Sequence, residues 1–79
     1  MFSVNVSLNS IDKVKEFVNI MTKQIFDVDL VSDRYVIDAK SIMGIFSLDL
    51  STPKELIVHT DDGTAFATLK EEIKKFIVD

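Results

Sequence analysis

The sequence contains no cysteine, only one proline and two glycines, and no long apolar run. Without cysteine, a disulfide framework, a thiolate metal site and a thiol nucleophile are all excluded. Scarce glycine and proline, together with 47% hydrophobic residues, are typical of a folded chain rather than a disordered one. No apolar stretch reaches membrane-spanning length, and the start MFSVNVSL lacks the features of a signal peptide. We therefore expect a cytoplasmic protein without a membrane partner.

Positive charge is also in short supply, with nine basic residues against thirteen acidic ones and a net charge of −4. The basic residues mostly stand beside acids in the sequence and form no stripe of the kind that binds nucleic acid, so no nucleic-acid partner is expected. A chain of 79 residues predicts one domain, residues 1–79, in which a single core gives modest stability. No motif indicates a cofactor or catalytic machinery, and we expect a protein that is not an enzyme.

Alternation of apolar and polar residues predicts strands at residues 2–8 and 55–60 and a hairpin within VDLVSDRYVID, residues 28–38. The turn of this hairpin is predicted at Asp33-Arg34. Both positions of a two-residue type I′ turn need a positive φ, for which arginine is a poor residue, so a loop longer than two residues is the alternative.

Apolar residues that recur at intervals of three and four predict three helices. The first should run from Ser10 to Lys23 or Gln24, with Asn9 or Ser10 as its N-cap and Asp12 in its first turn. Its predicted buried stripe is Ile11, Val14, Phe17, Val18, Met21 and Ile25. A short helix should run from Ser41 to about Leu48, with Ile45 and Leu48 inward. The last helix, capped by Asp62 or Thr64, should bury Phe66, Leu69, Ile73, Phe76 and Ile77.

The order of these elements is βαββαβα. Because each strand is apolar on one side only, two long helices and one short helix should cover one face of the sheet. Six residues on the apolar sides of their elements are expected to be buried in the core: Val14, Val18, Leu30, Val58, Leu69 and Ile73.

The segment AKSIMGIFSL, residues 39–48, resembles the second helix of HPr, the histidine-containing phosphocarrier of the bacterial sugar phosphotransferase system. The similarity extends without a gap from about Val14 to Asp49 and more loosely to the end. The resemblance implies a bacterial protein with an α+β, open-faced β-sandwich. It also implies a four-stranded antiparallel sheet in the order 1-4-2-3, which the pattern alone does not give.

The resemblance also shows that the residues that carry phosphate in HPr are replaced here. HPr carries phosphate on a histidine at the N-terminus of its first helix, where free N–H groups and the helix dipole favour an anion, and an arginine follows it. Extending the match sets Ser10 against that histidine and Asp12 against the arginine. Loss of phosphocarrier activity is therefore expected, with a non-histidine acceptor, Ser10 or Asp12, as the alternative.

The single histidine, His59, is predicted on a strand, on the solvent face, near Asp61 and Asp62. Asp27, Asp29 and Asp38 should project from the same outer face. We expect these residues to form a flat, solvated acidic surface, with neither a cleft nor a metal site.

The short helix is the predicted functional site. Ser41 matches the serine that a dedicated kinase phosphorylates in HPr of many Gram-positive bacteria, and it is also a good N-cap. Ile42, Met43 and Phe46 cannot all follow Ile45 inward, and the matching positions of HPr meet its protein partners. We expect a regulatory, protein-binding module that is a monomer or weak homodimer. A structural oligomer formed through Val31, Val36 and Ile57 is a further alternative.

Overall fold

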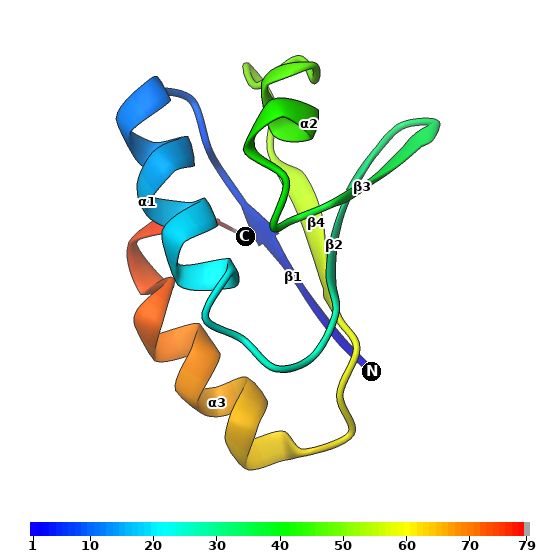
Figure 1. Ribbon diagram of the computed structural model, residues 1–79, viewed down its shortest axis with the longest axis vertical. Coiled ribbons are helices and arrows are strands. Elements are labelled where there is room, and N and C mark those ends of the chain that lie inside the picture. Colours follow the sequence, from blue (N-terminus) through cyan, green and yellow to red (C-terminus); the bar gives the residue numbers. More distant parts are fainter. Residues whose placement is uncertain (79) are drawn as a thin grey trace.

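The computed structural model describes residues 1–78. The elements follow the predicted order (Figure 1). A short helical turn and a fifth strand are added at the end. Their bounds are β1 (Phe2–Val6), α1 (Ile11–Met21), β2 (Val28–Ser32), β3 (Tyr35–Asp38), α2 (Ile42–Phe46), β4 (Lys54–Val58), α3 (Gly63–Glu72), the 3₁₀ helix η1 (Lys74–Phe76) and β5 (Ile77–Val78). None of the helices within residues 1–78 has the length and apolarity needed to cross a membrane.

The sheet has five strands in the order β3-β2-β4-β1-β5, and every neighbouring pair is antiparallel. The first four strands lie in the expected order 1-4-2-3, but the expected count of four strands is wrong because β5 is added beside β1. Ile77 pairs with Val6 in this strand instead of extending the stripe of the last helix. The reason is that α3 ends at Glu72, and η1 then buries Phe76 and redirects the chain toward the sheet.

The core lies between one face of the sheet and the helices, with α1 and α3 on the same side (Figure 1). All six residues expected in the core are buried: Val14, Val18, Leu30, Val58, Leu69 and Ile73. The ring of Phe17 meets that of Phe76 edge-on at 5.7 Å between centroids, which connects α1 to η1. An ion pair between Lys75 and Glu16 joins the same two elements at the surface.

The first helix is shorter than predicted at its C-terminal end. Ser10 caps it by accepting the N–H of Lys13 at 3.2 Å, as expected of a serine at this position. The helix ends at Met21, so Ile25 no longer follows the helical period and is 100% exposed. Ile11 is the first helical residue and is also exposed, because the buried stripe begins one turn later at Val14. The prediction that these two isoleucines are buried is wrong.

The β2–β3 hairpin turns through two residues, Asp33 and Arg34. The alternative of a longer loop is not found, because Ser32 pairs directly with Tyr35. Of the two turn residues, only Asp33 adopts a positive φ, of 47°. Aspartate tolerates this conformation better than arginine does. Arg34 therefore does not need the positive φ that would disfavour arginine in this turn.

Candidate functional site

The short helix α2 begins at Ser41, whose hydroxyl accepts the N–H of Gly44 at 3.2 Å. It spans Ile42–Phe46 and so ends before the predicted limit of Leu48. The helix lies close to β3: a Cβ added to Gly44 would be 2.7 Å from Cγ2 of Ile37. Gly44 has no positive φ, so its lack of a side chain serves the close approach of helix and strand.

The side chains of α2 divide into a buried and an exposed set. Ile45 is fully buried, and Ile42 is half-buried against the core. Met43 is 77% exposed and Phe46 is 39% exposed. Leu48, expected in the core with Ile45, is only half-buried because it lies beyond the end of the helix. Ile42, Met43 and Phe46 form an apolar surface, here called the α2 patch, with Ser41 at its N-terminal edge.

The N-terminus of α1 presents hydroxyl and carboxylate groups. Ser10 and Asp12 are both exposed, and the Ser10 hydroxyl already accepts a helix amide. The Nζ of Lys13 donates to Oδ1 of Asn9 at 3.0 Å, so the one cation of this turn has a local partner. An anion placed here would meet the negative charge of Asp12, which opposes the attraction of the helix dipole.

The histidine lies elsewhere, directly after β4. The Nε2 of His59 is 2.7 Å from Oδ2 of Asp29, and the N–H of His59 donates to the carbonyl of Asp27 at 3.0 Å. His59 and three aspartates, Asp27, Asp29 and Asp38, line a hollow of about 290 Å³. The expectation of a flat surface without a cleft is therefore wrong.

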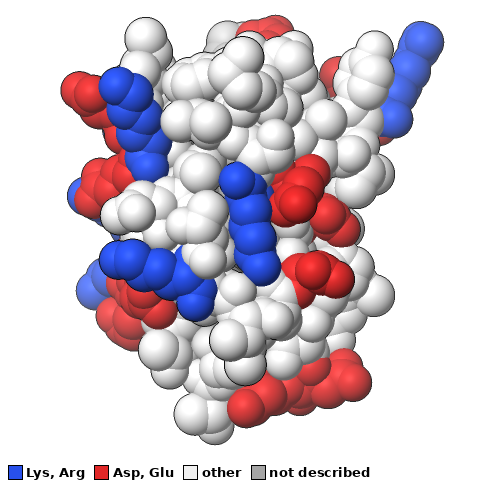
Figure 2. Space-filling view, viewed as in Figure 1, with Lys and Arg blue, Asp and Glu red and all other residues white. Residues whose placement is uncertain are grey.

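This hollow is acidic because the sheet register places Asp38 directly opposite Asp29. Figure 2 shows acidic side chains gathered over the side of the molecule that contains β2 and β3. The residues that line the hollow are three carboxylates and one imidazole. Among residues 1–78, no three histidine, aspartate or glutamate side chains are arranged to hold a metal ion.

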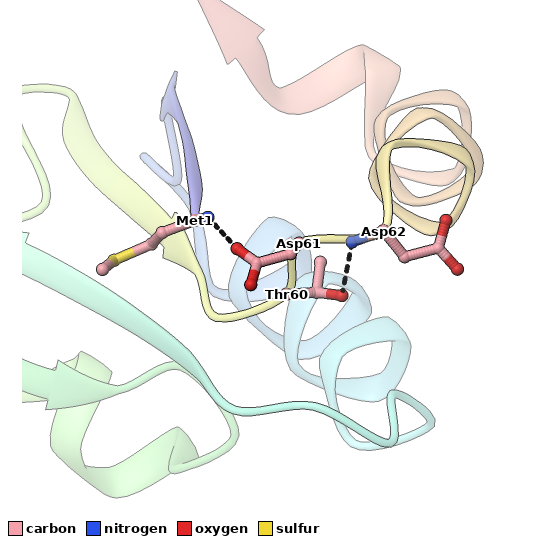
Figure 3. Close-up of polar contacts among 4 residues, drawn as sticks. All are labelled: Met1, Thr60, Asp61 and Asp62. Atoms are coloured by element: carbon pink, nitrogen blue, oxygen red, sulfur yellow. Dashed lines mark hydrogen bonds and ion pairs between the residues drawn. The ribbon is translucent and has the colours of Figure 1, made fainter.

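Asp61 and Asp62, expected near His59, make their polar contacts with Met1, Thr60 and the start of α3 (Figure 3). Oδ1 of Asp61 is 2.9 Å from the ammonium group of Met1, and this contact holds the pKa of the Asp61 carboxyl below its ordinary value. Asp62 caps α3 by accepting the N–H groups of Thr64 and Ala65, while its own N–H donates to Thr60. Asp62 therefore organises the start of α3, while Asp61 connects the same loop to Met1.

Comparison with known proteins supports an HPr-like fold. The crystal structure of HPr-C-His from Thermoanaerobacter tengcongensis superposes on 95% of this chain and 93% of its own, with a TM-score of 0.75 and 25% sequence identity. No protein-family model matches the sequence, and no curated protein matches it either. The chain thus has an HPr-like fold, and this likeness supports a relationship to the HPr phosphocarriers.

Sequence reasoning placed the members of the hollow on one face but missed their convergence. The alternation of each strand correctly gave the outward direction of Asp29 and Asp38. What brings His59 to Asp29 is the register of β2 against β4, in which Asp29 faces Ile57. An explicit register for that pair of strands would have revealed the contact.

Proposed function

We propose that this chain is a non-catalytic, HPr-like regulatory module of the bacterial cytoplasm, which docks a partner protein through the α2 patch. The single observation that carries the proposal is the 77% exposure of Met43 beside the fully buried Ile45 of the same helix. A flexible thioether in water has no folding benefit, whereas methionine and phenylalanine are enriched at protein interfaces.

The proposal includes the loss of phosphocarrier chemistry. At the start of α1, Ser10 occupies the cap, and Asp12 adds negative charge in the first turn. The only histidine of the sequence is held beside Asp29 at the end of β4. A serine phosphoester is too stable to be passed on readily, and the cap role of Ser10 gives a sufficient reason for its presence. These points weigh against the alternative in which Ser10 or Asp12 carries the phosphate.

Ser41 is proposed as a regulatory phosphorylation site at the edge of the α2 patch. Ser41 is half-buried, and its hydroxyl accepts the N–H of Gly44 at the start of the helix. A phosphate would add a charge of about −1.5 to −2 next to Ile42 and Met43. Docking against an apolar partner surface would then bury this charge at a high cost in free energy. A partner surface that carries arginine would instead be attracted.

The docking proposal is tested with the Met43→Glu, Phe46→Glu double variant in a pull-down from a lysate of the source cells. We expect the variant to lose the partner of the parent protein because two charges replace the centre of the patch. The matched control is the Ala67→Glu, Thr68→Glu variant, which adds the same charge at two exposed residues of α3. Retention of every partner by the patch variant would contradict the proposal.

The loss of phosphocarrier activity has its own test. After incubation with phosphoenolpyruvate and the first enzyme of the phosphotransferase system, the intact mass should be unchanged. A gain of one phosphate would contradict this expectation. Ser10→Ala and Asp12→Asn variants would then show whether either residue is the acceptor, and lability of the phosphate to acid would indicate an imidazole or acyl phosphate rather than a serine ester.

A further inference from the structure

The edge of the sheet at β3 provides a second surface, independent of the α2 patch. Within residues 1–78, β3 is the outermost strand on its side, so one edge of its backbone has no neighbouring strand. Tyr35 and Val36 of this strand are 62% and 65% exposed. Exposed edges are templates for another strand, and natural proteins usually block them with proline, lysine or a bulge. The sequence of β3, Tyr-Val-Ile-Asp, contains neither proline nor lysine.

The direction of the free backbone groups follows from a hydrogen bond at the end of the hairpin. The N–H of Ala39 donates to the carbonyl of Val28 at 2.9 Å, so these two residues form a hydrogen-bonded pair. Because such pairs alternate along an antiparallel ladder, the N–H and C=O of Val36 point away from β2, toward the free edge. The backbone groups of Arg34 and Asp38, each two residues from Val36, point toward the same free edge. The carbonyl of Asp38 already accepts from Ser41, which leaves its N–H for a further strand.

We propose that β3 pairs with β3 of a second copy of this chain, antiparallel and centred on Val36, to form a weak two-fold dimer with one continuous sheet. This register sets Val36 against Val36 of the second copy and Tyr35 against Ile37 of the second copy. It also sets Arg34 against Asp38 of the second copy, and by symmetry this pair of opposite charges occurs twice. Opposite charges and apolar groups that face each other across strands both stabilise pairing.

The charges select this register over its neighbours. A shift by two residues in one direction sets Val36 against Asp38, and a shift in the other direction sets Arg34 against Val36. Each alternative loses both ion pairs and places an apolar side chain opposite a charged one. The hairpin has no basic residue other than Arg34, and Figure 2 shows a basic side chain extending beyond the region of its tip. An isologous contact of this kind closes on itself and does not propagate into a fibre.

A second copy also fits this edge better than it fits the open face of the sheet. Stacking through Val31, Val36 and Ile57 would bring together two acidic hollows, and like charges at short range repel. Edge pairing instead keeps the hollows apart along the sheet and covers Tyr35. The interface is short, well below the roughly 1,000 Å² of a stable complex, so we expect a dissociation constant of about 0.1–1 mM.

The test is a dilution series of the full chain from about 1 mM to about 10 μM, followed by amide NMR shifts and sedimentation equilibrium. The dimer predicts concentration-dependent shifts at the amides of Arg34, Val36 and Asp38. Arg34→Glu should weaken self-association about tenfold, because each ion pair becomes a pair of like charges. Lys15→Glu, an exposed residue of α1, changes the net charge equally and should weaken self-association far less.

A mixture of two variants gives a sharper result. Arg34→Glu and Asp38→Lys proteins should each associate poorly alone, whereas their equimolar mixture should associate, because both cross-strand pairs then have opposite charges. The Asp38 carboxylate also accepts the N–H of Lys40, so folding of that variant is checked by circular dichroism. If the Asp38→Lys variant does not fold, the comparison of Arg34→Glu with Lys15→Glu tests the dimer without it. Absence of self-association up to about 1 mM, or equal effects of these two variants, would overturn the proposal.

Discussion

The two glycines of this chain should respond in opposite ways to replacement by alanine. Both lie in helices and neither has a positive φ. A Cβ on Gly63 would meet nothing within 4 Å, whereas a Cβ on Gly44 would be 2.7 Å from Cγ2 of Ile37 and 3.1 Å from Oγ of Ser41. The first replacement therefore changes only the chain's conformational freedom, while the second also introduces a steric conflict.

The magnitudes follow from these two effects. Replacing glycine by alanine in a helix interior, as at Gly44, gains up to about 1 kcal/mol. Gly63 is the first residue of α3, and Gly63→Ala should stabilise by about 0.4–1 kcal/mol because alanine restricts the unfolded chain. At Gly44 an overpacking cost of about 1–3 kcal/mol opposes this gain. The clashing Cγ2 is attached to a branched Cβ with few allowed rotamers, so the helix or the strand must move. We expect a net loss of about 0.5–2 kcal/mol for Gly44→Ala, combining these figures.

Urea unfolding monitored by circular dichroism measures both effects, and an unchanged slope would show that the comparison concerns stability alone. The contact itself is isolated by a double-mutant cycle with Ile37→Ala. Without the Ile37 side chain, Gly44→Ala should become neutral or stabilising, as at Gly63. If Gly44→Ala stabilises the parent protein as much as Gly63→Ala does, Ile37 does not set the position of α2.

Two further predictions concern the core and the charged surface. Leu69→Ala should cost about 2–5 kcal/mol, because this fully packed side chain leaves a cavity, and an unfolding free energy within about 1 kcal/mol of the parent would contradict that role. The hydroxyl of Ser51 lowers the pKa of Asp49, and the ammonium group of Met1 lowers that of Asp61, both from 3.8. Their small contributions are present above that value and are lost as the pH falls through the lower folded-state pKa values. Asp49→Asn and Asp61→Asn should therefore reduce the acid dependence of stability below about pH 4. Unfolding free energies measured in a pH series check this expectation. An unchanged pH dependence would show that neither contact stabilises the folded protein.

Local rules were sufficient for much of the fold. The caps at Ser10, Ser41 and Asp62 follow from side-chain oxygens placed just before an apolar period. The six predicted core residues follow from strand and helix periodicity, which depends only on neighbours along the chain. The exposure of Met43 also followed from period, because its partner positions in the same helix had to face the core.

The errors arose where local signals were absent. A strand of two residues has no period, so β5 could not be separated from the end of the preceding apolar stripe. Ile25 was assigned to the apolar stripe of the first helix because no glycine or proline follows Met21 to mark the end of the helix. The contact between His59 and Asp29 depends on the register of two strands that are far apart in sequence. Strand β5 and the contact between His59 and Asp29 thus required tertiary contacts that no local pattern encodes.

The two proposed surfaces meet at β3 but can be separated experimentally. The side chain of Ile37 lies against Gly44 and so positions α2, while the free backbone edge belongs to Val36 and its neighbours. Gly44→Ala should displace α2 and weaken partner docking through Met43, yet leave Arg34 and Val36 in place for self-association. Arg34→Glu should do the reverse. A Gly44→Ala protein that has lost both properties, while its hairpin amides keep their NMR shifts, would show that a single surface of α2 mediates both contacts.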